Sequence, residues 1–377
     1  MPGDAPVAID VTPMIGPRTG IGNAVAEILR AVSALEDGPR LVPYALSVRA
    51  RQMRADVPAT THFVPIPARV LLRSWTRLDA PRIDRFLGNA RVLHATNYLA
   101  PPSRLPTLIT VHDCSFVRYP ELCTPEVRAF EPILRRALTR GATIHTVSEF
   151  IADDVEEVFG RDLRAQGKLV VIPWGVPPLG PESAMPEALA TRIGARPYVL
   201  AIGTLEPRKN LAQLVSAFGE IAADLPDLLL VLAGRDGPAR PAVDAAIARL
   251  PQTVQQRVIL AGGVSDPARR ALLERATAVA YPSIYEGFGF PTLEAMSVGV
   301  PVVAARAGAV PEVTGDAAVL VDATDEQALG DAIARLVTDE PGRAALIARG
   351  WRQAARYSWR TTATALADCY AQLAGRA

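Results

Sequence analysis

The chain has 377 residues, of which 40 are Lys or Arg and 39 are Asp or Glu, so its formal net charge is +1. This length is enough for two ordinary domains, and the charge balance argues against broad nucleic-acid binding. The three cysteines, Cys114, Cys123 and Cys369, lack the number and spacing of a disulfide framework or a structural metal site. We see no signal peptide and no apolar run of about 18 residues, so a cytoplasmic protein is expected.

Patterns typical of buried strands alternate with helical patterns along the chain, as in parallel α/β architecture. In the first half, the predicted strands span residues 7–11, 91–95, 108–112, 143–147 and 169–172. In the second half, they span residues 198–202, 228–233, 258–261, 278–281, 300–304 and 318–321. Residues 173–196 are rich in Pro, Gly and Ala without periodicity, which predicts a linker and a domain boundary near residue 180.

A pair of glycines follows the first predicted strand. Gly20 and Gly22 belong to the sequence Thr-Gly-Ile-Gly-Asn at residues 19–23, where a helix is expected to begin. A single Gly-x-Gly is found about as often in a plain tight turn as in a ligand-binding loop. These residues alone leave both interpretations open.

A basic segment lies between residues 49 and 91, where nine arginines face three acids. Within it, apolar residues are interleaved with arginines: Arg69, Leu71, Leu72, Arg73, Trp75, Arg77 and Leu78. The pattern predicts either a basic amphipathic helix that meets anionic lipid or an ordinary solvated helix.

Polar side chains follow several strands of the first half. A lone histidine is more often a packing residue, but His112 ends the strand 108–112 at the edge where parallel sheets bind ligands. This position favours a functional role for His112. The other candidates at this edge are His94, Asn97, Tyr98, Ser148 and Glu149.

Only two of the basic residues are lysines, Lys168 and Lys209. Lys209 and Arg208 lie in a turn between the strand 198–202 and a helix expected from Asn210 onward. Cations at such a junction are well placed to neutralise a diphosphate. An isolated Arg-Lys pair is usually only a solvated pair of basic residues. This pair opens the first βα unit of the second half, which favours a binding role.

The loop after the strand 278–281 holds two glycines and two carboxylates. Glu286 lies in this loop with Gly287 and Gly289, and Glu294 lies eight positions later, in a helix that Pro291 opens. The glycines allow close approach of a ligand, and the helix N-terminus suits a phosphate. Like charges repel, so we interpret the two carboxylates as acceptors for sugar hydroxyls. The alternative is a pair of surface acids near a helix start.

The sequence YPSIYEGFGFPTLE at residues 281–294 resembles the E-x7-E signature of retaining GT-B glycosyltransferases of family 4. The likeness continues through residues 299–304 and 308–312 and through the order of elements along nearly the whole chain. It implies an α/β fold of two doubly wound Rossmann-like parallel-sheet domains that face a cleft. Residues 1–180 would bind the acceptor and residues 181–357 the nucleotide sugar, with the tail 358–377 crossing back to the first domain.

The resemblance assigns roles at the matching positions. Lys209 and Arg208 would contact the donor phosphates, and Glu286 and His112 would lie beside the donor sugar, which makes these four the catalytic set. Glu294 would hold the ribose. The further donor positions are Gly20, Gly22, Gly203, Thr204, Ser265, Gly287, Phe288, Gly289, Phe290 and Pro291. The acceptor positions are His94, Asn97, Tyr98 and Ser148. Many family members carry an arginine where this chain has Thr204, so the pattern departs from the family at one phosphate contact.

The implied activity is transfer of a hexose from a nucleotide diphosphate sugar to a hydroxyl of a glycan, lipid-linked or small-molecule acceptor, with retention through front-face attack. Residues 204–210 look like the mannosyltransferase-rich branch, so GDP-mannose is the first choice of donor and a UDP-hexose the second. No tightly bound cofactor is expected. No metal is expected either, because we find no Asp-x-Asp-type cluster and the cations already supply positive charge.

Three other kinds of protein fit the same pattern. A nucleotide-sugar 2-epimerase would share the architecture but need no acceptor, and a phosphorylase of the glycogen type would need a lysine for pyridoxal phosphate, for which only Lys168 is left. A non-catalytic sugar-nucleotide-binding subunit is the third alternative. Incubation with the donor alone separates them, because an epimerase changes the sugar without an acceptor.

Overall fold

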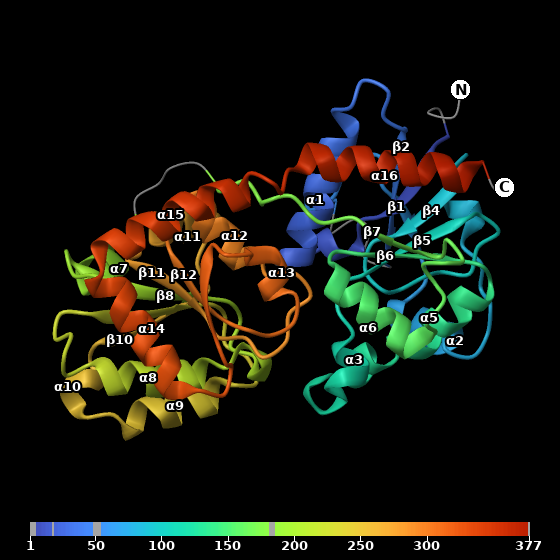
Figure 1. Cartoon of the computed structure of the whole chain (residues 1–377). Helices are drawn as coiled ribbons and strands as arrows, with labels where there is room; N and C mark the ends of the chain where they lie inside the picture. The colour runs from blue at the N-terminus through green and yellow to red at the C-terminus, as the bar shows by residue number, and fades with distance from the viewer. Residues whose placement is uncertain (1–4, 17–18, 48–53, 181–184, 376–377) are drawn as a thin grey trace. The chain divides into compact units, whose positions relative to one another are not determined.

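A computed structural model describes residues 5–16, 19–47, 54–180 and 185–375 (Figure 1). The chain divides into two compact units. Unit 1 comprises residues 1–177 and 357–377, and unit 2 comprises residues 178–356. Each unit contains one parallel sheet with helices on its faces, so the chain consists of two Rossmann-like α/β domains.

The sheet of unit 1 has seven parallel strands in the order β3-β2-β1-β4-β5-β6-β7. The strands are β1 (Val7–Asp10), β2 (Leu41–Leu46), β3 (His62–Val64), β4 (Val92–Ala95), β5 (Thr107–Val111), β6 (Thr143–Thr146) and β7 (Leu169–Val171). Strands β2 and β3 were not predicted. Pro43 interrupts the β2 pattern, and β3 is a three-residue edge strand that starts with the exposed His62.

The main helices of unit 1 are α1 (Gly20–Ser33), α2 (Ala68–Trp75), α3 (Ser115–Arg118), α4 (Pro125–Arg128), α5 (Phe130–Thr139), α6 (Glu149–Phe159) and α16 (Trp359–Ala374). Ser358 precedes helix α16, and its hydroxyl accepts a hydrogen bond from the Thr361 N–H and so caps the helix. It lies beside α1 on unit 1, as red and blue ribbons show in Figure 1. The last helix therefore returns to the first domain, as predicted.

The sheet of unit 2 has six parallel strands in the order β10-β9-β8-β11-β12-β13. The strands are β8 (Tyr198–Ile202), β9 (Leu229–Ala233), β10 (Val258–Gly262), β11 (Ala278–Tyr281), β12 (Val302–Ala305) and β13 (Ala318–Val321). Every predicted strand of this half is present, within two residues at each end. The reason is that each is a short, wholly apolar run bounded by turn residues.

The predicted linker at residues 173–196 is only partly irregular. Helix α7 (Glu187–Ile193) occupies its second half and buries Leu189 and Ile193. The prediction was wrong here because seven residues are too few for a helical period to stand out among the neighbouring Pro and Gly residues. Residues 181–184 lie outside the described residues.

Helices cover both faces of the unit 2 sheet (Figure 1). On one face lie α8 (Leu211–Ile221), α9 (Arg240–Arg249) and α14 (Glu326–Thr338), whose apolar residues join the sheet in one buried core. On the other face lie α11 (Asp266–Arg275), α12 (Phe290–Ser297) and α15 (Glu340–Ala354). The short helices α10 (Gln252–Gln255) and α13 (Val310–Thr314) connect strands.

The predicted basic amphipathic helix is present as α2, but only some of its apolar residues face outward. Leu71 and Trp75 of α2 are buried in the core of unit 1 and do not face outward. Val70 and Leu78 are 53% and 59% exposed, and the nearby arginines 69, 73 and 77 are exposed as well. Residues 48–53 of this segment lie outside the described residues. Among the described helices, none is long and apolar enough to cross a membrane.

Candidate functional site

Two cations and a carboxylate meet at the C-terminal edge of the unit 2 sheet. Glu286 Oε1 lies 2.5 Å from Lys209 Nζ and 2.8 Å from Arg208 Nη1. The side chains of Glu286 and Lys209 are only 9% and 12% exposed. Three of the four predicted catalytic residues are therefore in direct contact, although they come from segments 77 residues apart.

Tyr281, the last residue of β11, completes this cluster. Its hydroxyl accepts a hydrogen bond from Lys209 Nζ at 3.0 Å, and Nζ lies 4.9 Å from the centroid of the ring. A ring face at this distance attracts a cation. Tyr281 is therefore a second side chain, besides Glu286, that holds the ammonium in place.

The charge states of the cluster follow from its burial and its pairing. Burial alone would raise the pKa of Glu286, but Lys209 and Arg208 outweigh that effect and lower the pKa to about 2. Burial lowers the pKa of Lys209, and Glu286 partly restores it. Glu286 is thus an ionised carboxylate near neutral pH.

Glycines allow the turn after β8, which carries Arg208 and Lys209, to pack closely against neighbouring loops. Gly203 follows β8 with φ +150°, and a Cβ there would meet the aliphatic part of Lys209 at 3.4 Å. A Cβ on Gly234, after β9, would lie 1.7 Å from the carbonyl oxygen of Gly203. The Ile284 N–H then donates to the Arg208 carbonyl at 2.9 Å and ties the glutamate loop to the turn that carries the cations. Thr204 lies in this turn and is half-buried.

The glutamate loop is buried and is held from behind by Gly308. Gly308 has φ +58°, and a Cβ there would lie 2.6 Å from the nitrogen and 2.5 Å from the carbonyl oxygen of Glu286. The Ala309 N–H donates to that carbonyl at 2.9 Å. The backbone of Glu286 therefore sits in a groove that only glycine at position 308 leaves open.

Helix α12 starts directly after this loop. Gly289 precedes it with φ +100°, and the hydroxyl of Thr292 donates to the Gly289 carbonyl at 2.8 Å. The rings of Phe288 and Phe290 pack edge to face, with centroids 5.3 Å apart. Gly287 lies in the loop, and Pro291 lies in the first turn of the helix. The predicted donor residues 287–291 therefore all lie between Glu286 and the end of the first turn of α12.

Glu294 lies inside α12 and does not join the cation cluster. Its side chain is 1% exposed, and Oε2 accepts a hydrogen bond from Arg269 Nη2 of α11. Burial raises the pKa of Glu294, and Arg269 opposes that rise. Ser265 caps the same helix α11, and its hydroxyl accepts from the Ala268 N–H at 3.4 Å. The predicted ribose residue is thus paired with an arginine that the sequence did not single out.

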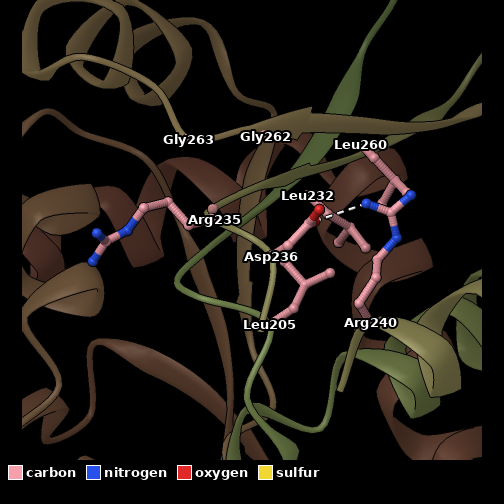
Figure 2. Close-up of a pocket in the computed structure, with 9 residues that line it drawn as sticks. Leu205, Leu232, Arg235, Asp236, Arg240, Leu260, Gly262 and Gly263 are labelled. Atoms are coloured by element: carbon pink, nitrogen blue, oxygen red, sulfur yellow. Dashed lines mark hydrogen bonds and ion pairs between the residues drawn. The ribbon is translucent and has the colours of Figure 1, made fainter. Parts of the chain in front are cut away.

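A pocket of about 330 Å³ opens at the same edge of the sheet, between the ends of β8, β9 and β10 (Figure 2). Its lining is Leu205, Leu232, Gly234, Arg235, Asp236, Arg240, Leu260, Gly262 and Gly263. Asp236 and Arg240 face each other as an ion pair at 2.7 Å, while Arg235 points the other way (Figure 2). The pocket therefore has an apolar floor and a charged rim.

In unit 1, His112 lies just after β5. Its Nε2–H donates to the Thr96 carbonyl at 2.9 Å, which fixes the ring and leaves Nδ1 as the acceptor nitrogen. The ring packs against Tyr98 and Trp174, with centroids 5.5 and 6.2 Å away. Burial lowers the pKa of His112, so the imidazole is neutral at pH 7.

The predicted acceptor residues fall into two groups. Tyr98, with φ +54°, stacks on Phe130 and accepts a hydrogen bond from the Asp113 N–H at 3.0 Å. Asn97 is half-buried, and its side-chain oxygen has no hydrogen-bond partner among the described residues. His94 and Ser148 have no exposed surface, which leaves no room for a direct contact with an acceptor.

The two glycines at the start of α1 differ in their surroundings. Gly20 is exposed in the first turn. Gly22 is buried, and a Cβ there would lie 2.5 Å from the Pro13 carbonyl oxygen. The hydroxyl of Thr19 caps the helix by accepting from the Gly22 N–H at 3.4 Å. Close packing therefore already explains why position 22 is glycine.

A chain of hydrogen bonds runs through the interior of unit 1. His145 Nε2 lies 2.9 Å from the Ile172 carbonyl, so it carries the proton, and Nδ1 accepts from Thr110 at 3.0 Å. Thr110 in turn accepts from His94 Nε2 at 2.9 Å, and His94 Nδ1 accepts from Tyr370 of α16 at 2.7 Å. Burial lowers the pKa of both histidines, of His145 to about 4. Each histidine in this chain of hydrogen bonds accepts through Nδ1, which requires a neutral imidazole.

Sequence reasoning missed several residues of these sites. Tyr281 and Gly308 were inside the matched motifs but received no role. Arg269 lies four positions after Ser265 on α11, and that spacing places it on the same face as the helix start. Nothing in the sequence indicated that it would reach Glu294, because the pairing depends on how α11 and α12 pack together.

The chain matches two family models. Residues 190–353 match the model described as glycosyl transferases group 1, and residues 19–178 match the one described as glycosyltransferase family 4. Among curated proteins, the O-antigen chain mannosyltransferase B of Escherichia coli is 31% identical over 283 residues, which cover 74% of each chain. A GDP-mannose-dependent alpha-(1-6)-phosphatidylinositol monomannoside mannosyltransferase of Mycolicibacterium smegmatis is 30% identical over 252 residues, covering 63% of this chain and 65% of that protein.

Solved structures share the fold at low sequence identity. Sucrose-phosphate synthase of Thermosynechococcus elongatus superposes with a TM-score of 0.76 at 18% identity, covering 99% of this chain and 100% of the other. HepE of Anabaena, in complex with UDP and glucose, has a TM-score of 0.71 at 18% identity, covering 97% and 99%. The two-domain arrangement of parallel sheets is thus the GT-B fold.

Proposed function

Because the chain belongs to glycosyltransferase family 4, we propose that it transfers a hexose from a nucleotide diphosphate sugar to a hydroxyl group, with retention of the anomeric configuration. The observation that carries this proposal is the buried cluster of Lys209, Arg208 and Glu286 at the C-terminal edge of the unit 2 sheet. Parallel sheets of this kind bind nucleotides at that edge. We therefore assign the donor to unit 2, residues 178–356, and the acceptor to unit 1.

The donor phosphates would bind to Lys209 and Arg208, with the N-terminus of α12 as a further source of positive potential. Cleavage of the sugar–phosphate bond leaves a nucleoside diphosphate, whose leaving oxygen gains negative charge. Fixed cations in a site with little water stabilise that charge strongly. Glu286 would orient the sugar through its hydroxyls, and Glu294 would hold the ribose. Gly203, Thr204 and Ser265 would border the nucleotide.

Retention requires that the new bond form on the face from which the phosphate leaves. We assign no covalent nucleophile, so the acceptor hydroxyl would attack that same face. The departing phosphate would take the hydroxyl proton. His112, neutral and with Nδ1 as an acceptor, would contact the donor sugar and support its positive charge.

GDP-mannose is the first choice of donor, and a UDP-hexose is the second. The support is the mannosyltransferase-like sequence at residues 204–210 and the likeness to mannosyltransferases of E. coli and M. smegmatis. The pocket in Figure 2 lies at the same edge of the sheet as the cluster, so we assign the nucleoside to this part of unit 2.

The acceptor would be a glycan, lipid-linked or small-molecule hydroxyl bound by unit 1, where Asn97 and Tyr98 are the best candidates to contact it. A role in polysaccharide synthesis at the cytoplasmic face of the plasma membrane fits exposed Val70 and Leu78 beside three arginines of α2 and its C-terminal flank. Flotation with anionic liposomes tests this assignment. Binding at low salt supports it, and no flotation under those conditions contradicts it.

Incubation of the purified protein with GDP-mannose, followed by NMR, tests the proposed chemistry. We expect slow release of GDP and of a sugar that appears first as the α-anomer, and Lys209→Met should slow both by about 10²–10³. Appearance of a different GDP-hexose instead would indicate an epimerase. No change with GDP-mannose or with UDP-hexoses would indicate a binding subunit.

Metal independence is a separate part of the proposal, because Lys209 and Arg208 already supply the positive charge that a metal would provide. Activity should persist in excess EDTA. Complete loss that Mg²⁺ or Mn²⁺ restores would contradict this assignment.

A further inference from the structure

One oxygen atom of Glu286 contacts both cations of the cluster. Oε1 of Glu286 lies within 2.8 Å of Lys209 Nζ and of Arg208 Nη1, and Glu206 Oε2 lies 3.0 Å from Arg208 Nε. The formal charges of these two cations and two carboxylates cancel. The groups that we assign to the donor phosphates are thus already paired with protein carboxylates in the structure.

A phosphate group cannot simply be added to this arrangement. Glu286 is nearly fully buried and ionised, and a phosphate oxygen placed on Lys209 would come close to its carboxylate. Two anions so close together in a poorly solvated site repel strongly. The carboxylate therefore has to leave the cations when the phosphate arrives. Once it has left, it needs new hydrogen-bond donors, because a buried carboxylate without partners is costly.

Lys209 keeps its position during such an exchange. Tyr281 holds it through the 3.0 Å hydrogen bond and the 4.9 Å contact with the ring, and Gly203 packs against its aliphatic part. The ammonium therefore remains in place for the phosphate, and the carboxylate of Glu286 is the member of the pair that moves.

We infer that Glu286 is a built-in counter-anion that competes with the donor phosphates and is displaced only when sugar hydroxyls can take it up. This inference rests on the proposed function. A nucleotide sugar offers both phosphate oxygens for the cations and hydroxyls for Glu286, so every buried group finds a partner. A bare nucleoside diphosphate offers only the phosphates. Glu286 therefore selects the intact donor over the nucleotide product and promotes product release.

The test compares the affinities of GDP and GDP-mannose by isothermal titration calorimetry, with UDP and UDP-glucose in parallel. The variants are Glu286→Gln and the matched control Glu206→Gln, which also removes a carboxylate bonded to Arg208 but at a half-exposed position. We expect Glu286→Gln to bind GDP at least about fivefold more tightly than the wild type and GDP-mannose more weakly. Glu206→Gln should change both affinities by the same small factor.

Three outcomes overturn the inference. The first is a Glu286→Gln variant whose affinity for both nucleoside diphosphates is unchanged or lower. The second is an equal gain in Glu206→Gln, which would indicate a general charge effect. The third concerns the wild type and needs no variant to fold: it is a favoured nucleotide sugar that binds less than about tenfold more tightly than its nucleoside diphosphate. Absence of any nucleotide binding would instead overturn the proposed function itself.

Discussion

The carboxylate of Glu294 and the guanidinium of Arg269 form an ion pair inside unit 2, between helices α12 and α11, where the Glu294 side chain is 1% exposed. Removal of one partner of a buried pair leaves an uncompensated charge. Arg269→Met should therefore lower the free energy of unfolding by about 3–5 kcal/mol. Chemical denaturation measures this free energy. As a control, Arg240→Met removes the exposed ion pairs with Asp236 and Asp244 and should lower the free energy of unfolding by less than about 1 kcal/mol.

The pH dependence of the Arg269→Met variant is a second check on the same pair. Burial already raises the pKa of Glu294 in the folded protein, and loss of Arg269 should raise it further. A raised folded-state pKa contributes stability at low pH that is lost as the pH rises. The decrease in the free energy of unfolding caused by Arg269→Met should thus be smaller at pH 5 than at pH 8. A loss that is equal at both values would argue against a buried carboxylate left without its partner.

Lys209 can be tested against a matched control, because the chain has only one other lysine, Lys168. Lys209→Met should lower kcat by about 10²–10³, the range found when one transition-state donor is removed. Lys168→Met should leave kcat within about twofold. Steady-state measurement of GDP release decides between them. Equal effects of the two substitutions would contradict the role of Lys209.

Gly308 offers a test of the Glu286 backbone position. Gly308 and Gly315 both have positive φ, +58° and +56°, a conformation that disfavours alanine at either position. Only at Gly308 would the new Cβ meet the Glu286 backbone, at 2.5 Å, whereas at Gly315 the nearest atom lies 3.4 Å away on the Gln353 side chain. Gly315→Ala should lose about 1 kcal/mol of stability, and Gly308→Ala should lose more, because its Cβ meets backbone atoms. Only Gly308→Ala should also lose most of its kcat, and an active Gly308→Ala would show that the placement of Glu286 is unimportant.

We expect the protein to lose stability in acid because of the buried histidines of unit 1. Burial lowers the pKa of His94 well below its usual range and that of His145 to about 4, while the unfolded chain titrates near 6.5. A lowered folded-state pKa contributes stability above 6.5 that is lost as the pH falls toward 4. Asp10 acts in the opposite direction, because burial raises its pKa to about 6.

A comparison of variants separates the histidine contribution from that of Asp10. Between pH 7 and pH 5, one such histidine changes the free energy of unfolding by about 2 kcal/mol. His145→Gln should reduce the acid-induced loss by that amount, and the exposed His62→Gln should leave it unchanged. An identical pH dependence in the two variants would mean that His145 is not the neutral link of the hydrogen-bond chain.

Most strands of both domains could be predicted, because each strand of a parallel sheet is a short apolar run. The exceptions have local causes, such as Pro43 in β2 and the three-residue length of β3. The donor residues could be proposed because Lys209 and Glu286 lie in turns that follow strands, and such turns gather at one edge of a sheet.

Contacts between helices could not be predicted from the sequence. Arg269 meets Glu294 only because α11 packs on α12, and His94 is a buried member of a hydrogen-bond chain only because Tyr370 of α16 lies above it. Both contacts join residues with no common motif. The sequence predicted an acceptor contact for His94, whereas the structure gives it no exposed surface.

The most direct test of the central claim is thermal unfolding of the purified protein with a panel of nucleotides: GDP, UDP, dTDP, ADP and their common sugar conjugates. A ligand that binds only the folded state adds about 2.7 kcal/mol of stability at a hundredfold excess over its Kd. We predict selective stabilisation by GDP-mannose that is lost in Lys209→Ala and Glu294→Ala. Stabilisation by another nucleotide sugar would overturn the assignment of mannose, and no response to any of them would contradict the account of unit 2 as a donor-binding domain.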